Sequence, residues 1–375
     1  MPLSKIQTGN LGRRNKIING TGHIAQRSTS AAETVAFVLD RWKIDAYNQD
    51  QLALQISQST DTPSGLGFPT SHLVNVNTAE TAVANDEYLR YFQTIEARNL
   101  QDLGYGSSSP KKLQLTFWVK ATGTNVTGTY GVLFWIEDAN KYQNATYTIS
   151  AADTWEKKTI EVGTTGHAAI ANDSGRGMRV NFHLMAGSNY TSGTYSNEWG
   201  TGAGSAGNTH FAGGHAQNTF VQTVGNKWYM TGCQLEVGDS ASDFEHRSFV
   251  EELSLCQRYY YKNMDSPPAD NIPNTDTTSG NGYMGFIMYS NSSGRTPYFY
   301  FPVEMRADPT ITVYSSERAN TSGRFAIFTG AWGATTSSTP TVDVKRVGFS
   351  ITTSGGTGNG YGYLMAGGFD ANAEL

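Results

Sequence analysis

Residues 113–121, LQLTFWVKA, decide the class of fold. Apolar side chains stand at the odd-numbered positions, and the side chains between them are polar or amphipathic: Leu113, Leu115, Phe117 and Val119 alternate with Gln114, Thr116, Trp118 and Lys120. Successive side chains of a β-strand point to opposite faces of the sheet. The stretch therefore predicts a strand with one face in a hydrophobic core and a wetter opposite face.

Similar short runs recur along the chain, separated by residues that favour turns. Strands are predicted in a first series at 130–137, 145–150, 155–162, 178–185 and 227–237, and in a second series at 283–289, 297–303, 310–315, 324–328, 341–351 and 361–369. In the strand at 227–237, Tyr229, Thr231, Cys233, Leu235 and Val237 are expected to share one side. Many short strands of this kind are typical of antiparallel sandwiches and barrels.

Composition agrees with an all-β protein. Glycine occupies 41 of 375 positions and aromatic residues make up 12%, which favours turns and pleated surfaces over a helical bundle. A net charge of −5 and a pI near 5.8 argue against duplex nucleic acid as a partner. No secretory signal and no run of about 18 apolar residues is visible, so we expect synthesis in the cytoplasm and no membrane insertion.

One segment has helical periodicity. Phe249, Leu253, Cys256 and Tyr260 recur at spacings of three and four, which predicts a short linker helix over 249–260. Residues 266–282 follow with a Pro-, Asn- and Thr-rich composition that suits an exposed loop. A domain boundary is therefore expected near 250–265.

Motifs for catalysis or cofactor binding are missing from the sequence. Gly202, Gly204 and Gly207 satisfy G-x-G-x-x-G, but no strand precedes them and no helix follows, so the pattern does not indicate a nucleotide site. Neither a P-loop, nor an H-E-x-x-H zinc motif, nor a G-x-S-x-G elbow occurs. We predict a non-enzymatic protein with no catalytic residues, no cofactor and no metal site. Both cysteines are interpreted as buried thiols.

An acidic group near the end of the first strand series leaves two interpretations open. Asp239, Asp243 and Glu245 could offer oxygen ligands to calcium, although a solvated strand end is the favoured interpretation.

Aromatic residues in glycine-rich loops are the positive functional signal. Residues 187–214 form a long loop that contains Tyr190, Tyr195 and Trp199, and Trp332 stands in a shorter G-A-W-G segment. Aromatic rings pack against the apolar faces of sugars, and loops on a rigid sandwich are usual places for such sites. These four residues are the candidate glycan-binding residues. The alternative is that they pack against a neighbouring domain or chain.

Several longer segments carry a family resemblance. Residues 15–27, NKIINGTGHIAQR, are followed by Asp40, Arg41 and Trp42, and further on come LTFWVKATG at 115–123 and YMTGCQLEVGDSASDFEHRSFVEELSLCQRYYYK at 229–262. FPVEMRADPTITVYS at 301–315 and DANAEL at 370–375 complete the set. Together these segments resemble bacteriophage tail-fibre and related virion appendage proteins, and they span nearly the whole chain.

The resemblance implies an all-β architecture of four parts. These are an arm at 1–14 that attaches to the virion or to another subunit, a carbohydrate-binding-like jelly roll at 15–250, a linker helix at 251–264 and a C-terminal β-sandwich at 265–375. It also implies a homotrimer on the phage tail or capsid that binds host cell-surface polysaccharide. The alternative is a capsid decoration or tail connector with a structural role, and a depolymerase is a third possibility. The host and the receptor stay open.

Overall fold

The fold is that of a computed structural model, which describes residues 13–191, 197–201, 218–263, 283–290, 293–315, 326–328, 332–334, 341–354 and 362–375. The chain divides into two compact units, one of residues 1–252 with residue 375 and one of residues 253–374. The division falls inside the helix that sequence analysis places between two β-domains. The expected all-β class is confirmed, since strands dominate both units.

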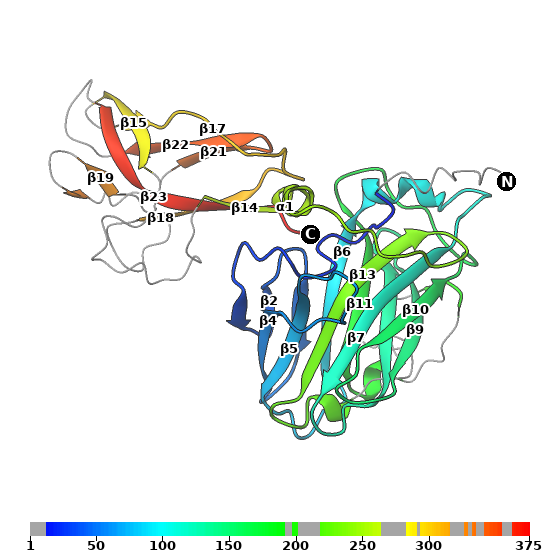
Figure 1. Ribbon diagram of the computed structural model, residues 1–375. Coiled ribbons are helices and arrows are strands. Elements are labelled where there is room, and N and C mark those ends of the chain that lie inside the picture. Colours follow the sequence, from blue (N-terminus) through cyan, green and yellow to red (C-terminus); the bar gives the residue numbers. More distant parts are fainter. Residues whose placement is uncertain are drawn as a thin grey trace. The chain divides into compact units, whose positions relative to one another are not determined.

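The first unit consists of two antiparallel sheets that face each other across a core (Figure 1). The six-stranded sheet has the order β1 (Ser30–Ala32), β4 (Ala53–Ser59), β5 (Ser71–Thr78), β13 (Lys227–Val237), β7 (Leu113–Thr122) and β10 (Glu156–Val162). The seven-stranded sheet has the order β12 (Gly200–Thr201), β9 (Lys141–Ile149), β8 (Gly128–Ile136), β11 (Arg176–Ala186), β6 (Tyr88–Glu96), β3 (Lys43–Tyr47) and β2 (Val35–Phe37).

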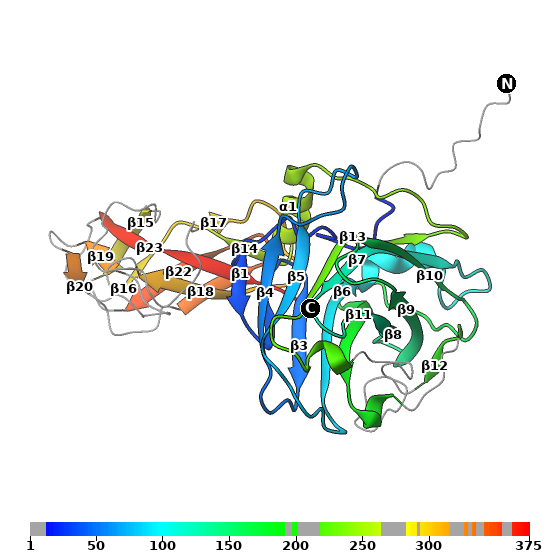
Figure 2. The ribbon, with the colours of Figure 1, turned by 60° about the horizontal axis from the view of Figure 1, so that its bottom comes forward.

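From β6 to β13 the chain crosses repeatedly from one sheet to the other (Figure 2). Such crossings are the connection pattern of a jelly roll. Three 3₁₀ turns of described residues interrupt the strands, at Ala97–Leu103, Ser188–Tyr190 and Asn218–Phe220.

Strand β7 follows the alternation that its sequence predicts on the core side. Leu113, Leu115, Phe117 and Val119 are all fully buried between the sheets. The opposite face is drier than expected, because Gln114, Thr116 and Lys120 are also buried. The Gln114 amide donates to the Gly238 carbonyl, and Lys120 pairs with Asp61 while its ammonium lies 4.8 Å from the centre of the Tyr229 ring. Most of this face is therefore covered, and of its β7 side chains only Trp118 and Thr122 are partly exposed.

Strand β13 has a bulge that the predicted alternation does not anticipate. Its pairing with β7 shifts register between Thr231 and Gln234, around Gly232, whose φ is +58°. Trp228 and Met230 point into the core before the bulge, and Cys233 and Leu235 do so after it. The prediction of one continuous side from Tyr229 to Val237 is therefore wrong, because the extra residue of a bulge changes which positions face inward.

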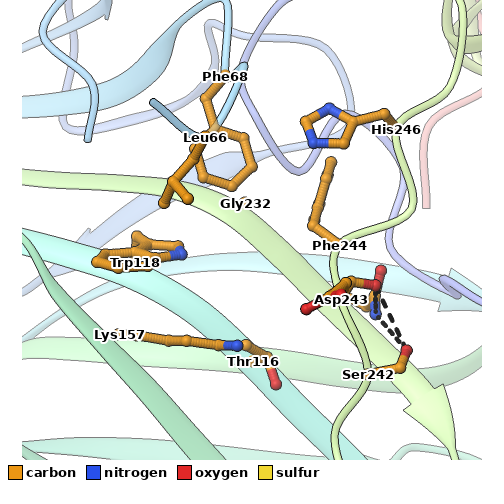
Figure 3. A pocket seen from close by; sticks show the side chains of 11 residues that line it. Leu66, Phe68, Thr116, Trp118, Lys157, Gly232, Ser242, Asp243, Phe244 and His246 are labelled. Carbon is orange, nitrogen blue, oxygen red and sulfur yellow. Dashed lines mark hydrogen bonds between the residues drawn. The ribbon is translucent and has the colours of Figure 1, made fainter. Parts of the chain in front are cut away.

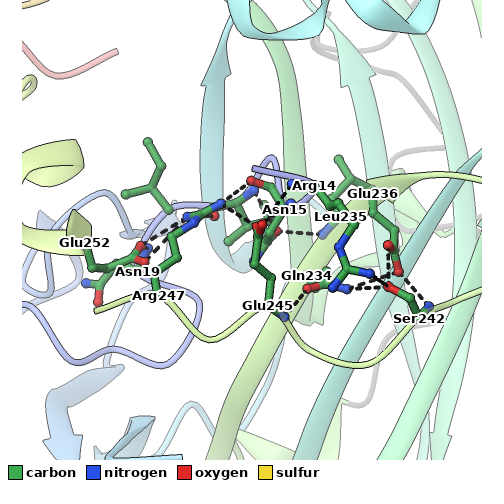
Figure 4. Close-up of polar contacts among 12 residues, drawn as sticks. Arg14, Asn15, Asn19, Gln234, Leu235, Glu236, Ser242, Glu245, Arg247 and Glu252 are labelled. Atoms are coloured by element: carbon green, nitrogen blue, oxygen red, sulfur yellow. Dashed lines mark hydrogen bonds and ion pairs between the residues drawn. The ribbon is translucent and has the colours of Figure 1, made fainter. Parts of the chain in front are cut away.

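The first described residues of the chain are bound along β13 (Figure 4). Asn15 donates to the Cys233 carbonyl at 3.1 Å and accepts from the Leu235 amide at 3.0 Å, and the Lys16 amide donates to the Leu235 carbonyl at 2.8 Å. Glu245 accepts the backbone amides of Arg14 at 3.1 Å and Asn15 at 2.9 Å. The carboxylate of Glu245 is therefore occupied by protein donors and largely buried, so it is neither a solvated strand end nor available to calcium.

Arg247 and Glu252 make further polar contacts with residues 15–19 (Figure 4). Arg247 donates to the carbonyls of Asn15 and Ile17 and pairs with Glu252, which accepts the Asn19 amide. Residues 15–19 and residues 233–252, which carry the family resemblance at the two ends of the first unit, are therefore hydrogen-bonded to each other. Except for its last two residues, the arm expected at 1–14 lies outside the described residues.

Helix α1 runs over Phe249–Gln257, shorter than the predicted 249–260. The Ser248 hydroxyl accepts the Glu251 amide at the start of the helix. At the other end, Tyr260 begins β14 (Tyr260–Lys262) and pairs with Asn372. Strand pairing therefore takes Tyr260 out of the helix. Cys233 and Cys256 are both buried, as expected.

The described strands of the second unit join through β23 (Gly362–Asn372), which pairs with β14, β15 (Tyr283–Ser290), β18 (Thr310–Ser315) and β19 (Ala326–Phe328). Its other strands are β16 (Ser293–Arg295), β17 (Phe299–Tyr300), β20 (Trp332–Ala334), β21 (Thr341–Lys345) and β22 (Gly348–Ser354). The strand predicted at 297–303 shortens to β17, and the one predicted at 341–351 is the hairpin of β21 and β22. Phe301, Met305, Phe349 and Phe369 form the centre of its core.

Candidate functional site

Tyr190 lies in the 3₁₀ turn that follows β11, held against the loop before β6. The Gly187 amide donates to the Glu87 carbonyl at 2.8 Å, and the Asn189 amide donates to the Asn85 carbonyl at 2.9 Å. A Cβ atom at Gly187 would collide with the carbonyl oxygen of Ala84, so this approach needs a glycine. The backbone thus fixes where Tyr190 is presented.

Two further tyrosines meet Tyr190 and form what we call the tyrosine cluster, Tyr47, Tyr88 and Tyr190. Tyr47 and Tyr88 are directly paired across β3 and β6, and their rings are stacked with centres 5.2 Å apart and planes 14° apart. The Tyr190 ring meets Tyr88 edge-on at 5.3 Å. Tyr47 is 46% exposed, and Tyr88 and Tyr190 are partly exposed. The cluster is thus an accessible aromatic surface at one end of the paired strands β3 and β6.

A partly buried ion pair lies beside Tyr88 and supports the cluster. Arg90 donates from Nε at 2.9 Å and from Nη2 at 2.6 Å to one oxygen of Asp45, and its guanidinium lies 4.9 Å from the centre of the Tyr88 ring. Desolvation raises the pKa of the Tyr88 and Tyr190 hydroxyls, although the charge of Arg90 acts in the opposite direction. The hydroxyls are therefore neutral near pH 7 and can both donate and accept hydrogen bonds.

Further from the tyrosines, side chains on the same face of the seven-stranded sheet pack over one another and leave little of it exposed. Arg179 lies between two rings, with its guanidinium 4.5 Å from the centre of Phe92 and 4.8 Å from the centre of Trp135, and it pairs with Glu137 at 2.8 Å. Burial lowers the pKa of Arg179 to about 10. Because Arg179 and the neighbouring Asn181 are buried, this central part of the face is less accessible than the tyrosine cluster.

The structure does not bring the other predicted glycan-binding residues to this surface. Trp199 is only 4% exposed, its indole N–H donates to the Gly163 carbonyl at 2.8 Å, and its ring meets Tyr105 edge-on at 5.9 Å. The expectation that Trp199 stands on an exposed loop is therefore wrong, because the ring is part of the core. Tyr195 lies outside the described residues, and Trp332 is described only by its backbone at the start of β20.

Sequence reasoning missed Tyr47 and Tyr88. Alternation within residues 88–96 would have placed Tyr88, Arg90 and Phe92 on one face, but no local pattern shows that β3 pairs with β6. The pairing, rather than either strand alone, makes the cluster.

Within the described ranges, no group of three His, Cys, Asp or Glu side chains is arranged to hold a metal ion. None of the described helices reaches the length and hydrophobicity that crossing a bilayer would require.

No protein-family model matches the sequence, and no curated protein matches it. Solved structures that resemble part of the chain are carbohydrate-binding modules. One, a family 61 module in complex with β-1,4-galactotriose, is 10% identical with a TM-score of 0.29 over 60% of this chain and 99% of that chain. Another, the family 11 module of a cellulosomal cellulase of Clostridium thermocellum, is 10% identical with a TM-score of 0.27 over 58% and 98%.

A third is the C-terminal family 22 module of a Clostridium thermocellum protein, 11% identical with a TM-score of 0.27 over 58% of this chain and 99% of that chain. These scores are too low to transfer a ligand to this chain.

Proposed function

We propose that this protein binds glycans of a host cell surface through the tyrosine cluster, as an attachment protein of a bacteriophage virion. The observation that supports glycan binding is the meeting of three partly exposed tyrosines, two stacked and one edge-on, on a fixed backbone. The virion role rests on the sequence resemblance of residues 15–27, 40–42 and 229–262 to virion appendage proteins.

The cluster offers both kinds of contact that a sugar needs. The apolar C–H face of a pyranose packs against an exposed ring such as Tyr47, and neutral phenol hydroxyls donate to or accept from its hydroxyl groups. The Arg90–Asp45 pair and the backbone contacts of residues 187–189 hold the rings before a ligand arrives. A site fixed in this way loses little entropy on binding.

The experiment is binding of purified protein to host cells and to their isolated surface polysaccharide, comparing Tyr47→Ala and Tyr190→Ala with the unchanged chain. Loss of one ring contact should weaken binding about 5- to 10-fold per site. Tyr300→Ala is the matched control, because Tyr300 is an even more exposed tyrosine, at 77%, that belongs to the second unit. Equal losses in all three variants, or no binding by the unchanged protein, would overturn the proposal.

The alternative of a decoration or connector protein predicts a different result. Such a protein would bind particles that lack it and would leave host polysaccharide unbound. Locating the chain on the particle with labelled antibody separates an exposed appendage from an internal connector.

A further inference from the structure

A cavity of about 200 Å³ lies on the outer face of the six-stranded sheet, in a part of the first unit that the tyrosine cluster does not touch (Figure 3). Its floor is formed by β7, β10 and the bulge of β13, and residues 66–68 and 242–246 enclose it. Trp118 and Lys157, which are direct neighbours across β7 and β10, lie on one side of it. Phe244 and His246 lie on the other side.

The apolar part of the cavity is an array of rings. Phe68 packs edge-on against Phe244 with ring centres 5.2 Å apart and is stacked with His246 at 5.5 Å. A Cβ atom at Gly232 would lie 2.5 Å from the Phe68 ring, so the glycine of the bulge makes the room that Phe68 occupies. Across the cavity Trp118 is only half-buried, which leaves part of its indole available.

The polar part consists of one buried hydroxyl and two solvent-exposed charged groups. Thr116 is 5% exposed and lines the cavity, and its hydroxyl oxygen has no hydrogen-bond partner among the described residues. A buried hydroxyl in that state calls for an explanation, and a molecule bound in the cavity would supply one. Lys157 and Asp243 also line the cavity, and within the described part of the chain neither side chain forms an ion pair.

We infer that this cavity binds one uncharged sugar ring, at the end or at a branch of a glycan. The space is smaller than the roughly 300–1,000 Å³ of pockets that hold drug-sized ligands, so it suits a single ring. One ammonium and one carboxylate leave the lining without net charge, and together they can donate to and accept from hydroxyl groups. Trp118 provides the flat surface for the C–H face of the ring.

This site would be distinct in kind from the tyrosine cluster. A small, solvent-open cavity admits a single terminal or branch ring, whereas the wider aromatic surface can contact residues inside a polymer. The inference rests on the contacts of the cavity alone and not on the proposed function.

The test is saturation-transfer difference NMR with the methyl glycosides of glucose, galactose and mannose, and with methyl glucuronide as an anionic probe. Leu66→Trp is designed to fill the cavity from a residue that is 38% exposed, and Thr116→Val removes only the hydroxyl. A Tyr47→Ala, Tyr190→Ala double variant is the control for the other site. Thermal melting of each variant verifies that it is folded.

We expect at least one neutral glycoside to give a signal that Leu66→Trp abolishes, that Thr116→Val weakens about tenfold in affinity, and that the double tyrosine variant retains. A signal lost only in the tyrosine variant would overturn this inference and leave the proposed function standing. Stronger cavity-dependent binding of the glucuronide would overturn the uncharged class. No signal from any glycoside would overturn the site itself.

Discussion

At the scale of single residues, removing the buried hydroxyl of Thr116 and removing that of Thr231 should have different effects on stability. Thr116→Val should leave the free energy of unfolding unchanged or raise it by about 1 kcal/mol, because an unsatisfied buried hydroxyl is removed. Thr231→Val is the matched control, since that hydroxyl donates to the Thr70 carbonyl at 2.7 Å and is fully buried. It should cost about 1 kcal/mol. Urea denaturation measures both, and equal losses would contradict the assignment of Thr116.

His72 predicts a pH dependence of stability. The Asn19 carbonyl, 3.1 Å away, accepts from Nε2, so Nδ1 accepts from the Tyr91 hydroxyl at 2.8 Å and the ring is neutral. Burial lowers the pKa of His72 from 6.5 to about 3. Between pH 6.5 and about 3, His72 therefore binds a proton in the unfolded chain but not in the folded chain. The free energy of unfolding falls as the pH drops through this range.

Replacing this histidine isolates its share of the dependence. In His72→Gln the slope of unfolding free energy against pH should decrease by up to about 1.4 kcal/mol per pH unit across that window. The variant will also be less stable overall, so the slope and not the absolute value is the readout. Denaturant titrations at several pH values measure it, and an unchanged slope would show that His72 is not buried neutral.

At the scale of the element, the bulge of β13 depends on its glycine. Gly232→Ala should cost about 2 kcal/mol or more, because φ is +58° and the new methyl group meets the Phe68 ring. Gly225→Ala is the control, with φ of +85° and open space around its Cβ position. It should show the backbone cost alone. If both substitutions cost the same in urea denaturation, the packing of Phe68 on the bulge contributes nothing.

The elements also show how far sequence patterns reach. The bounds of β13 and β18 agree with the predicted 227–237 and 310–315, because apolar alternation and flanking turns mark both ends. No strand was expected before residue 113, yet β1 to β6 lie there. In β6 nearly every residue is buried on both faces, including Arg90 and Glu96, so its hydrophobic alternation is hidden.

The candidate site was predictable only in part, for a related reason. Tyr190 belongs to a glycine-rich stretch that draws attention by composition, whereas Tyr47 and Tyr88 stand at ordinary strand ends. Trp199 has the same local surroundings as Tyr190 in sequence but is buried. The composition of a loop shows that it contains aromatic residues, but it does not predict which of them are buried in the core.

At the scale of the whole molecule, we propose that the chain forms the homotrimer that the family resemblance implies, and its mass in solution tests this. Light scattering of the full-length chain should give three times the 40.7 kDa of one chain. Closed three-fold symmetry would present three tyrosine clusters at once, which raises avidity by roughly 10² to 10⁴ when the geometry allows simultaneous contact. A mass of one chain at all concentrations would remove multivalent attachment from the proposal.

The seating of the first described residues along β13 has a consequence for biosynthesis. Asn15 is separated from its partner Cys233 by 218 positions, so the ribosome has made nearly all of the first unit before this contact can form. Long-range pairing of this kind slows folding and keeps apolar strands unprotected while the chain emerges. The segment around Asn15 must therefore be made long before its partner strand, and a chain that ends before residue 235 lacks the contacts that hold this segment.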